Sequence, residues 1–176
     1  MEEEQAKTVE ALQLAIQMEI DGKAYYQKAG KTSNTRMGKE LFQWLAGEED
    51  KHRQRFEQIY ESIRKNQAWP EVAAKPGGAN KLNSIFANAT GAGVPKAKRQ
   101  SAELKAIAKA MEMENKTQNY YKEQGEKARY PAGRKFYESL AAEERGHYLA
   151  LVDYREYLVD PAGWFRKAEH HSLDGG

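Results

Sequence analysis

The sequence contains the same metal-ligand pattern twice. Glu49 and His52 form a Glu-x-x-His motif. Glu144 and His147 form a second one 95 residues later. On an α-helix, side chains three residues apart lie on one face, so a carboxylate and an imidazole at this spacing can bind one metal ion. Two copies of the motif therefore predict two metal ions.

A third acidic residue repeats with the same offset. Glu19 precedes the first motif, and Glu114 precedes the second by the same distance. Two helices that each provide a Glu, with two that each provide Glu-x-x-His, form the ligand set of a di-iron carboxylate bundle. One Glu-x-x-His is a weak signal, but two copies at a common offset, each with a matching third Glu, are much harder to obtain by chance. We favour a binuclear metal site over a metal-free bundle.

The repeat leaves one choice open. Glu48 and Glu143 lie four residues before the two histidines and share their helix faces approximately. This pair also repeats with the common offset. The symmetry of the sequence therefore does not choose between these two residues and their neighbours Glu49 and Glu144.

The ligand types indicate which metal is bound. Four carboxylates on inward helix faces would repel one another and lose hydration unless cations neutralise them, and two divalent ions balance four carboxylates. Carboxylate oxygens with one imidazole per metal suit iron or manganese. We expect two iron ions, with manganese as the alternative and zinc as a further alternative in recombinant protein.

Composition narrows the function further. The chain has no cysteine, which excludes disulfides and thiolate metal sites and leaves His and carboxylates as the strong ligands. Its 28 basic and 26 acidic residues form a mixed surface, so we expect no nucleic-acid partner. No apolar run approaches the length of a membrane helix, and the acidic start is unlike a signal peptide. We expect no membrane partner and a cytoplasmic location.

The segments around the first motif have the pattern of amphipathic helices. Apolar residues recur at helical spacing over 5–29, and a similar stripe follows to about residue 65. Gly30 is expected to stop the first helix, and the polar cluster 31–35 to form a short turn with capping side chains. A short turn makes two helices antiparallel neighbours. We predict a helical hairpin over 5–65.

A second, pseudo-symmetric hairpin is predicted over 101–159. Ser101 is expected to cap its first helix. Pro131 is expected at the first position of its second helix, where the missing N–H costs nothing. The tail over 160–176 contains Trp164 and is expected to form a short C-terminal helix that covers one end of the bundle.

Residues 66–100 form the connection between the two hairpins. The segment is rich in Pro and Gly and has one helical candidate over 81–89. A bundle helix of about 28 residues is about 42 Å long, and a connection of this size can return along it and start a parallel third helix. We predict an all-α four-helix bundle in up-down-down-up order, forming a single domain over 1–176.

These motifs and their order resemble ferritin-like di-iron proteins, and rubrerythrin-type proteins in particular, over the helices of residues 5–157. The resemblance implies two bridging ligands, Glu49 and Glu144, that contact both metal ions. It also implies that each ion is completed by one Glu and one His. The full ligand set is Glu19, Glu49, His52, Glu114, Glu144 and His147.

The sequence departs from the rubrerythrin pattern in two respects. Full rubrerythrins add a cysteine-ligated rubredoxin module, which a chain without cysteine cannot contain. They also carry an extra Glu three residues after the third helix's ligand, where this chain has Thr117, and the symmetric position is Gly22. The resemblance thus implies a separate electron donor, rubredoxin-like or other, and a homodimer, whereas the departures weaken the case for the rubrerythrin peroxidase cycle.

Tyr26 and Tyr121 are the candidate catalytic residues. They lie seven residues after Glu19 and Glu114, and hence on the same helix faces. There a phenol could hydrogen-bond a ligand carboxylate or relay an electron. The alternative is that both rings fill the core, each with a satisfied hydroxyl.

Three functions fit these observations. The first hypothesis is a di-iron oxidoreductase of the rubrerythrin and ferritin type, which reduces peroxide or dioxygen at the binuclear site. The alternative is an iron-binding or ferroxidase protein for iron storage or transfer, without committed peroxidase turnover. The third is a structural or partner-binding bundle that keeps metal only for stability.

Overall fold

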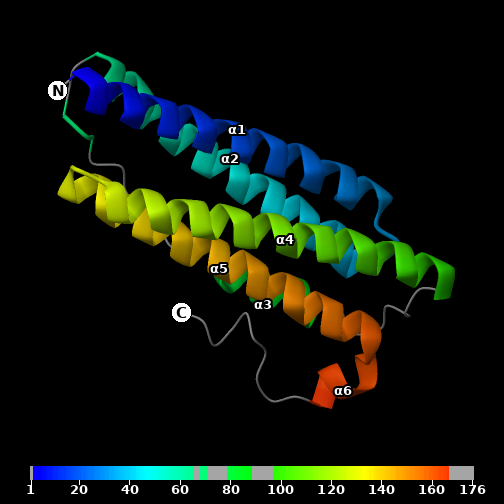
Figure 1. Ribbon diagram of the computed structural model, residues 1–176. Coiled ribbons are helices and arrows are strands. Elements are labelled where there is room, and N and C mark those ends of the chain that lie inside the picture. The colour runs from blue at the N-terminus through cyan, green and yellow to red at the C-terminus, as the bar shows by residue number, and fades with distance from the viewer. Residues whose placement is uncertain (1, 66–67, 71–78, 89–96, 167–176) are drawn as a thin grey trace.

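The computed structural model describes residues 2–65, 68–70, 79–88 and 97–166. All the regular structure in these ranges is helical. Four long helices form the bundle, and two short ones accompany it (Figure 1). In chain order the helices are α1 (Glu2–Thr32), α2 (Arg36–Arg64), α3 (Ala79–Ala87), α4 (Ala97–Lys127), α5 (Pro131–Val159) and α6 (Pro161–Arg166).

The long helices form two antiparallel hairpins that pack against each other. Helix α1 pairs with α2, and α4 pairs with α5, while α1 also contacts α4 and α2 contacts α5. In Figure 1, α2 and α4 run in the same direction, so the order is up-down-down-up. Helix α3, in the connection between the hairpins, packs against α2. The predicted all-α bundle of two hairpins joined by a long crossover is confirmed.

Local sequence signals explain where two helices begin. Thr35 is the N-cap of α2, and its side chain accepts a hydrogen bond from the backbone N–H of Gly38 at 2.8 Å. Pro131 is the first residue of α5, as predicted. Thr35 and Pro131 each follow the turn of one hairpin, so they fix where the second helix of that hairpin begins.

Two predicted helix boundaries are wrong. Helix α1 continues past Gly30 to Thr32. A Cβ at Gly30 would lie 3.5 Å from Phe42 Cβ and 3.6 Å from the Lys39 carbonyl, which are ordinary van der Waals distances. Gly30 therefore lies inside α1, at its contact with α2, and does not end the helix. Helix α4 begins at Ala97, so Ser101 lies inside the helix and is not its cap.

The apolar core is divided into two clusters, one toward each end of the bundle. On α2, for example, Leu45 belongs to the first cluster and Phe56 to the second. Glu49 and His52 lie between them on the same helix. The bundle therefore consists of two apolar layers with a polar layer in the middle.

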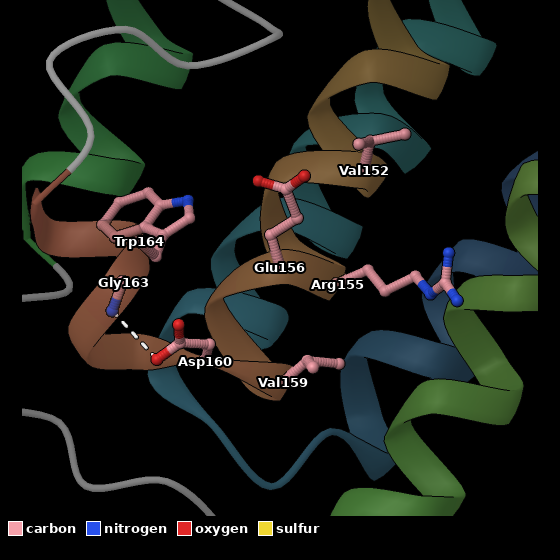
Figure 2. Close-up of a pocket in the computed structure, with 7 residues that line it drawn as sticks. All are labelled: Val152, Arg155, Glu156, Val159, Asp160, Gly163 and Trp164. Carbon is pink, nitrogen blue, oxygen red and sulfur yellow. Dashed lines mark hydrogen bonds between the residues drawn. The ribbon is translucent and has the colours of Figure 1, made fainter.

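Helix α6 covers one end of the bundle. Trp164 is buried, with its ring 5.8 Å from that of Phe86 on α3 and 5.5 Å from that of Tyr157 on α5. The backbone N–H of Gly163 donates to Asp160 Oδ1 at 2.9 Å, as Figure 2 shows. The predicted short C-terminal helix is thus present at 161–166, while residues 167–176 lie outside the described residues. The groove of about 350 Å³ beside it contains none of the predicted site residues.

A buried polar cluster joins the turn of the first hairpin to both helices of the second. The carboxylate of Glu103 on α4 accepts hydrogen bonds from the Ser33 hydroxyl, the Asn34 backbone N–H at 3.1 Å and the Tyr154 hydroxyl at 2.6 Å. Tyr154 lies on α5 and is also 2.6 Å from Thr35 Oγ1. These contacts fix how the two hairpins are aligned at this end.

Gly38 is needed for this cluster to form. A Cβ at Gly38 would overlap the Tyr154 hydroxyl and Ser33 Oγ. Gly38→Ala is therefore expected to lower the free energy of unfolding by about 2 kcal/mol or more, measured by urea titration. Gly47→Ala is the matched control, because no atom beyond its chain neighbours and the adjacent backbone of α2 lies within 4 Å of its Cβ position. It is expected to stabilise α2 by up to about 1 kcal/mol, and equal losses in both variants would contradict the prediction.

Candidate metal centre

The six predicted ligands meet in the polar layer at the middle of the four long helices. Each side of the layer is closed by one of the apolar clusters. All six residues are buried, with exposed fractions of at most 4%. They are Glu19 on α1, Glu49 and His52 on α2, Glu114 on α4, and Glu144 and His147 on α5.

The six residues form two overlapping groups. Within each group, one ligand atom per residue lies within 4.8 Å of all the others. Glu49 and Glu144 belong to both groups, as expected of bridging carboxylates. We name the groups position one, formed by Glu19, Glu49, His52 and Glu144, and position two, formed by Glu49, Glu114, Glu144 and His147.

In position one, the imidazole of His52 turns Nδ1 toward the carboxylates. Nδ1 lies 3.0 Å from Glu144 Oε1, 3.4 Å from Glu49 Oε2 and 3.7 Å from Glu19 Oε2. All three contacts converge on one nitrogen. A cation placed among these atoms would therefore have oxygen and nitrogen donors from three helices.

In position two, His147 has the corresponding orientation. Its Nδ1 lies 3.2 Å from Glu144 Oε2, 3.6 Å from Glu114 Oε2 and 3.9 Å from Glu49 Oε1. The two imidazole rings stack, with centroids 5.5 Å apart and planes 18° from parallel. The two positions are thus adjacent as well as alike.

The carboxylates perturb one another strongly. Burial and the charge of Glu144 raise the pKa of Glu49 well above its usual value and that of Glu114 to about 8. For Glu144, burial acts in the same direction, but the neighbouring His52 and His147 outweigh it and lower its pKa. The metal-free cluster therefore keeps protons that isolated glutamates would lose at neutral pH.

The histidines show the complementary effect. Burial by itself lowers the pKa of an imidazole, but the charges of Glu144 and Glu19 outweigh it at His52 and raise its pKa well above the usual value. The pKa of His147 is raised in the same way by the nearby carboxylates of Glu114 and Glu144. In the metal-free protein, protons thus neutralise part of the cluster's negative charge. They occupy the same oxygen and nitrogen atoms that metal ions bind.

Unpartnered atoms show that the residues fit a metal centre. His52 Nδ1, Glu114 Oε2 and Glu144 Oε1 are fully buried and make no hydrogen bond of normal geometry, although His52 Nδ1 and Glu144 Oε1 lie only 3.0 Å apart. Buried polar atoms are rarely left in this state, and each one here is a ligand-type atom facing the cluster. Two divalent cations would satisfy these atoms and balance the four carboxylates. The donor set therefore fits a binuclear metal site.

The structure also distinguishes the neighbouring glutamates by their contacts. Glu48 is absent from both groups, and its Oε1 lies 2.7 Å from Lys51 Nζ. Glu143 is absent as well, and its Oε2 lies 3.1 Å from Nε2 of His52, the ring nitrogen that faces away from the cluster. The geometry thus favours Glu49 and Glu144 as the bridging pair.

The candidate tyrosines contact the cluster across the bundle. The Tyr26 hydroxyl donates to Glu114, and the Tyr121 hydroxyl donates to Glu19. The sequence analysis allowed each phenol to hydrogen-bond a ligand carboxylate without naming which one. The Glu on the same helix is seven residues away, which is about 10 Å and too far for this contact. Because α1 and α4 are antiparallel, each tyrosine lies beside the Glu of the other helix. Burial, with the charges of Glu114 and Glu19 respectively, raises both tyrosine pKa values well above 10, so both phenols remain donors.

The positions that depart from the rubrerythrin pattern contribute no ligand. A Cβ at Gly22 would lie 3.4 Å from Cγ of Glu49, so the bare backbone of α1 packs against a shared carboxylate. The Thr117 hydroxyl donates to the backbone carbonyl of Met113 at 3.1 Å. The site therefore has six ligand-type residues and lacks an extra carboxylate from either position.

Sequence reasoning missed Arg55 and interpreted Trp44 as core packing, but both residues lie beside the histidines. Arg55 Nη1 lies 3.1 Å from Oε1 of Glu143, and the Trp44 ring meets that of His147 edge to face at 5.4 Å. Neither residue has a matching counterpart in the repeat, because the positions 95 residues later are Ala150 and Ser139. The available signal was helical spacing, since Arg55 lies three residues after His52.

Comparison with known families agrees with this geometry. The chain matches the family model described as Rubrerythrin over residues 10–155, a range that includes all six ligand-type residues. Comparisons with curated proteins and with solved structures found no significant match. In the part of the chain that the structure describes, no helix is long and apolar enough to cross a membrane.

The match to the Rubrerythrin family model covers most of the sequence. The chain therefore belongs to the rubrerythrin family of ferritin-like di-iron proteins.

Proposed function

We propose that this protein is a di-iron oxidoreductase that reduces peroxide or dioxygen. The observation that carries the proposal is the pair of overlapping ligand groups that share Glu49 and Glu144. Shared carboxylates hold two cations close together, which suits chemistry that needs two metal ions acting on one small molecule. Family membership supports iron as the metal, with manganese as the alternative.

Each ligand has a proposed role. Glu19 with His52, and Glu114 with His147, would each complete one iron, while the shared carboxylates would bridge the pair. When bound, two ferrous ions would supply one electron each, and these two electrons with two protons would reduce one hydrogen peroxide to two water molecules. The two apolar clusters lie between the site and the two ends of the bundle, and they would keep water from reaching the site along the bundle axis.

The two tyrosines are proposed to orient the non-bridging carboxylates. Tyr26 holds one oxygen of Glu114, and Tyr121 holds one oxygen of Glu19. A hydrogen bond to a ligand carboxylate limits its rotation and sets which oxygen faces the metal. Because burial keeps both phenols protonated, each remains a donor throughout the neutral pH range.

A second candidate function is iron oxidation for storage or transfer, without committed peroxidase turnover. The observation that favours it is the missing extra carboxylate at Gly22 and Thr117, which separates this site from the rubrerythrin pattern. For the first function we further propose a separate electron donor, rubredoxin-like or other, acting on a cytoplasmic homodimer. The second function needs no such donor.

Anaerobic loading with Fe(II), followed by exposure to peroxide or dioxygen, tests the proposal. We expect two irons per chain by metal analysis, an absorption change on oxidation, and repeated turnover when a chemical reductant is added. Fewer than two irons at saturation would refute the binuclear site. A single oxidation without turnover would favour the storage or transfer function.

The same assay tests the tyrosines. Tyr26→Phe and Tyr121→Phe each remove one hydrogen bond to a ligand carboxylate and are expected to slow oxidation about tenfold. Tyr137→Phe is the matched control, because Tyr137 is buried outside the site and its hydroxyl has no hydrogen-bond partner. If all three variants behave alike, the tyrosines only fill the core.

A further inference from the structure

The two metal positions differ just outside their ligands. In position one, Nε2 of His52 lies 3.1 Å from Glu143 Oε2. The carboxylate of Glu143 accepts hydrogen bonds from Arg55 Nη1 at 3.1 and 3.2 Å. Arg55 and Glu143 are 12% and 17% exposed, and His52 is fully buried. A guanidinium, a carboxylate and an imidazole thus form a continuous chain that ends at a ligand.

The sequence repeat does not reproduce this chain in position two. Glu48 is the counterpart of Glu143, but it pairs with Lys51, whose side chain is 54% exposed. The counterpart of Arg55 is Ala150, which has no charge to offer. Among the described residues, no side chain hydrogen-bonds to Nε2 of His147. Among the described residues, the imidazole of position two therefore lacks the carboxylate partner on Nε2 that position one has.

We propose that Glu143 and Arg55 are positioning residues that make position one the first to fill with metal. This inference rests on the proposed binuclear site. When a cation takes the place of the proton on Nδ1, Glu143, an acceptor, keeps the remaining proton of the His52 ring on Nε2 and leaves the Nδ1 lone pair directed at that cation. Nδ1 is the unpartnered atom of that ring. Arg55 in turn fixes the carboxylate.

The physical effect is on both geometry and ligand strength. An imidazole that donates to a carboxylate is a more basic ligand, and its orientation no longer has to be fixed when metal binds. Loss of such a partner generally weakens metal binding by about 10- to 100-fold. We therefore expect the wild-type protein to bind two ions in order, with His52 engaged before His147.

Titration of the metal-free protein with Zn(II), followed by NMR of the histidine ring nitrogens, tests this order. Zinc is diamagnetic, so both rings remain observable. In the wild type, the His52 signals are expected to change with the first equivalent and the His147 signals with the second. The Nε2 proton of His52 should persist in slow exchange. In Glu143→Ala the order should be lost, and the first dissociation constant should rise about tenfold or more.

Two further variants keep the test decisive. Arg55→Lys retains the charge and is expected to weaken the first binding step severalfold, which provides an answer if Glu143→Ala fails to fold. Glu48→Ala, at the symmetric position, should leave the order unchanged. Two zinc ions with an unaltered order in Glu143→Ala or Arg55→Lys would overturn this inference alone. Fewer than two ions in the wild type would overturn the binuclear site as well.

Discussion

Glu49→Ala or Glu144→Ala is expected to reduce metal binding at both positions, whereas His52→Ala or His147→Ala should affect mainly one. Each shared carboxylate belongs to both ligand groups and offsets the charge of two cations. Its loss leaves the repulsion between those cations less screened. A histidine belongs to one group, so its loss leaves the other ion with a Glu, a His and both shared carboxylates.

Metal analysis after anaerobic Fe(II) loading measures this division. We expect fewer than one iron per chain in the two shared-carboxylate variants and about one in the two histidine variants. Oxidation by peroxide should fall at least 100-fold in all four, because the reaction needs one electron from each iron. Circular dichroism separates metal loss from unfolding.

Glu48→Ala is the matched control for Glu49→Ala. Glu48 is the adjacent residue on α2 and pairs with Lys51 outside the cluster, so this variant should retain two irons. Equal iron loss from alanine variants of all six ligand-type residues would contradict the division between shared and single-position ligands. Unchanged oxidation in Glu49→Ala and Glu144→Ala would instead indicate Glu48 and Glu143 as the bridging ligands.

The centre of this site was predictable because helix geometry and the repeat act together. A residue's helix face follows from its position in the sequence, so Glu49 and His52 had to share a face. The constant offset then assigned the equivalent residues of the second half. Apolar residues on either side of each motif, such as Leu45 and Phe56, placed the motifs in the middle of the bundle.

What the sequence could not show depends on contacts between helices. The partner of Tyr26 is Glu114 because α1 and α4 are antiparallel neighbours, and no spacing within one helix contains that information. Arg55 lies outside the repeat and acquires a role only where α5 brings Glu143 beside it. Gly30 is of a residue type that often ends helices, yet it lies inside α1 where that helix packs against α2.

The cluster also predicts how metal-free protein responds to pH. Glu114, with a pKa raised to about 8, contributes stability that is fully present below its usual value of 4.5 and is lost as the pH rises to about 8. Glu49, His52 and His147 also have raised pKa values, so their contributions decline with rising pH as well. The pKa of Glu144 is lowered, so its contribution is already complete above about pH 4.5 and does not change in this window. Metal-free protein should therefore become less stable between pH 5 and pH 8.

Metal binding should have the opposite pH dependence, and the melting temperatures of metal-free and Mn(II)-loaded protein are expected to diverge as the pH rises. Ions replace the protons on the same oxygens and nitrogens, so their affinity increases as those protons become easier to remove. Free metal at 100 to 1,000 times its dissociation constant stabilises the fold by about 3–4 kcal/mol, which raises the melting temperature by about 10 °C for a chain of this size.

Calorimetry at pH 5.5, 6.5 and 7.5 measures the difference in melting temperature between the metal-free and the Mn(II)-loaded protein. In Glu49→Ala this difference is expected to be small at each pH. Equal melting temperatures at pH 7.5, or a gap that narrows from pH 5.5 to 7.5, would mean that the buried carboxylates do not bind metal.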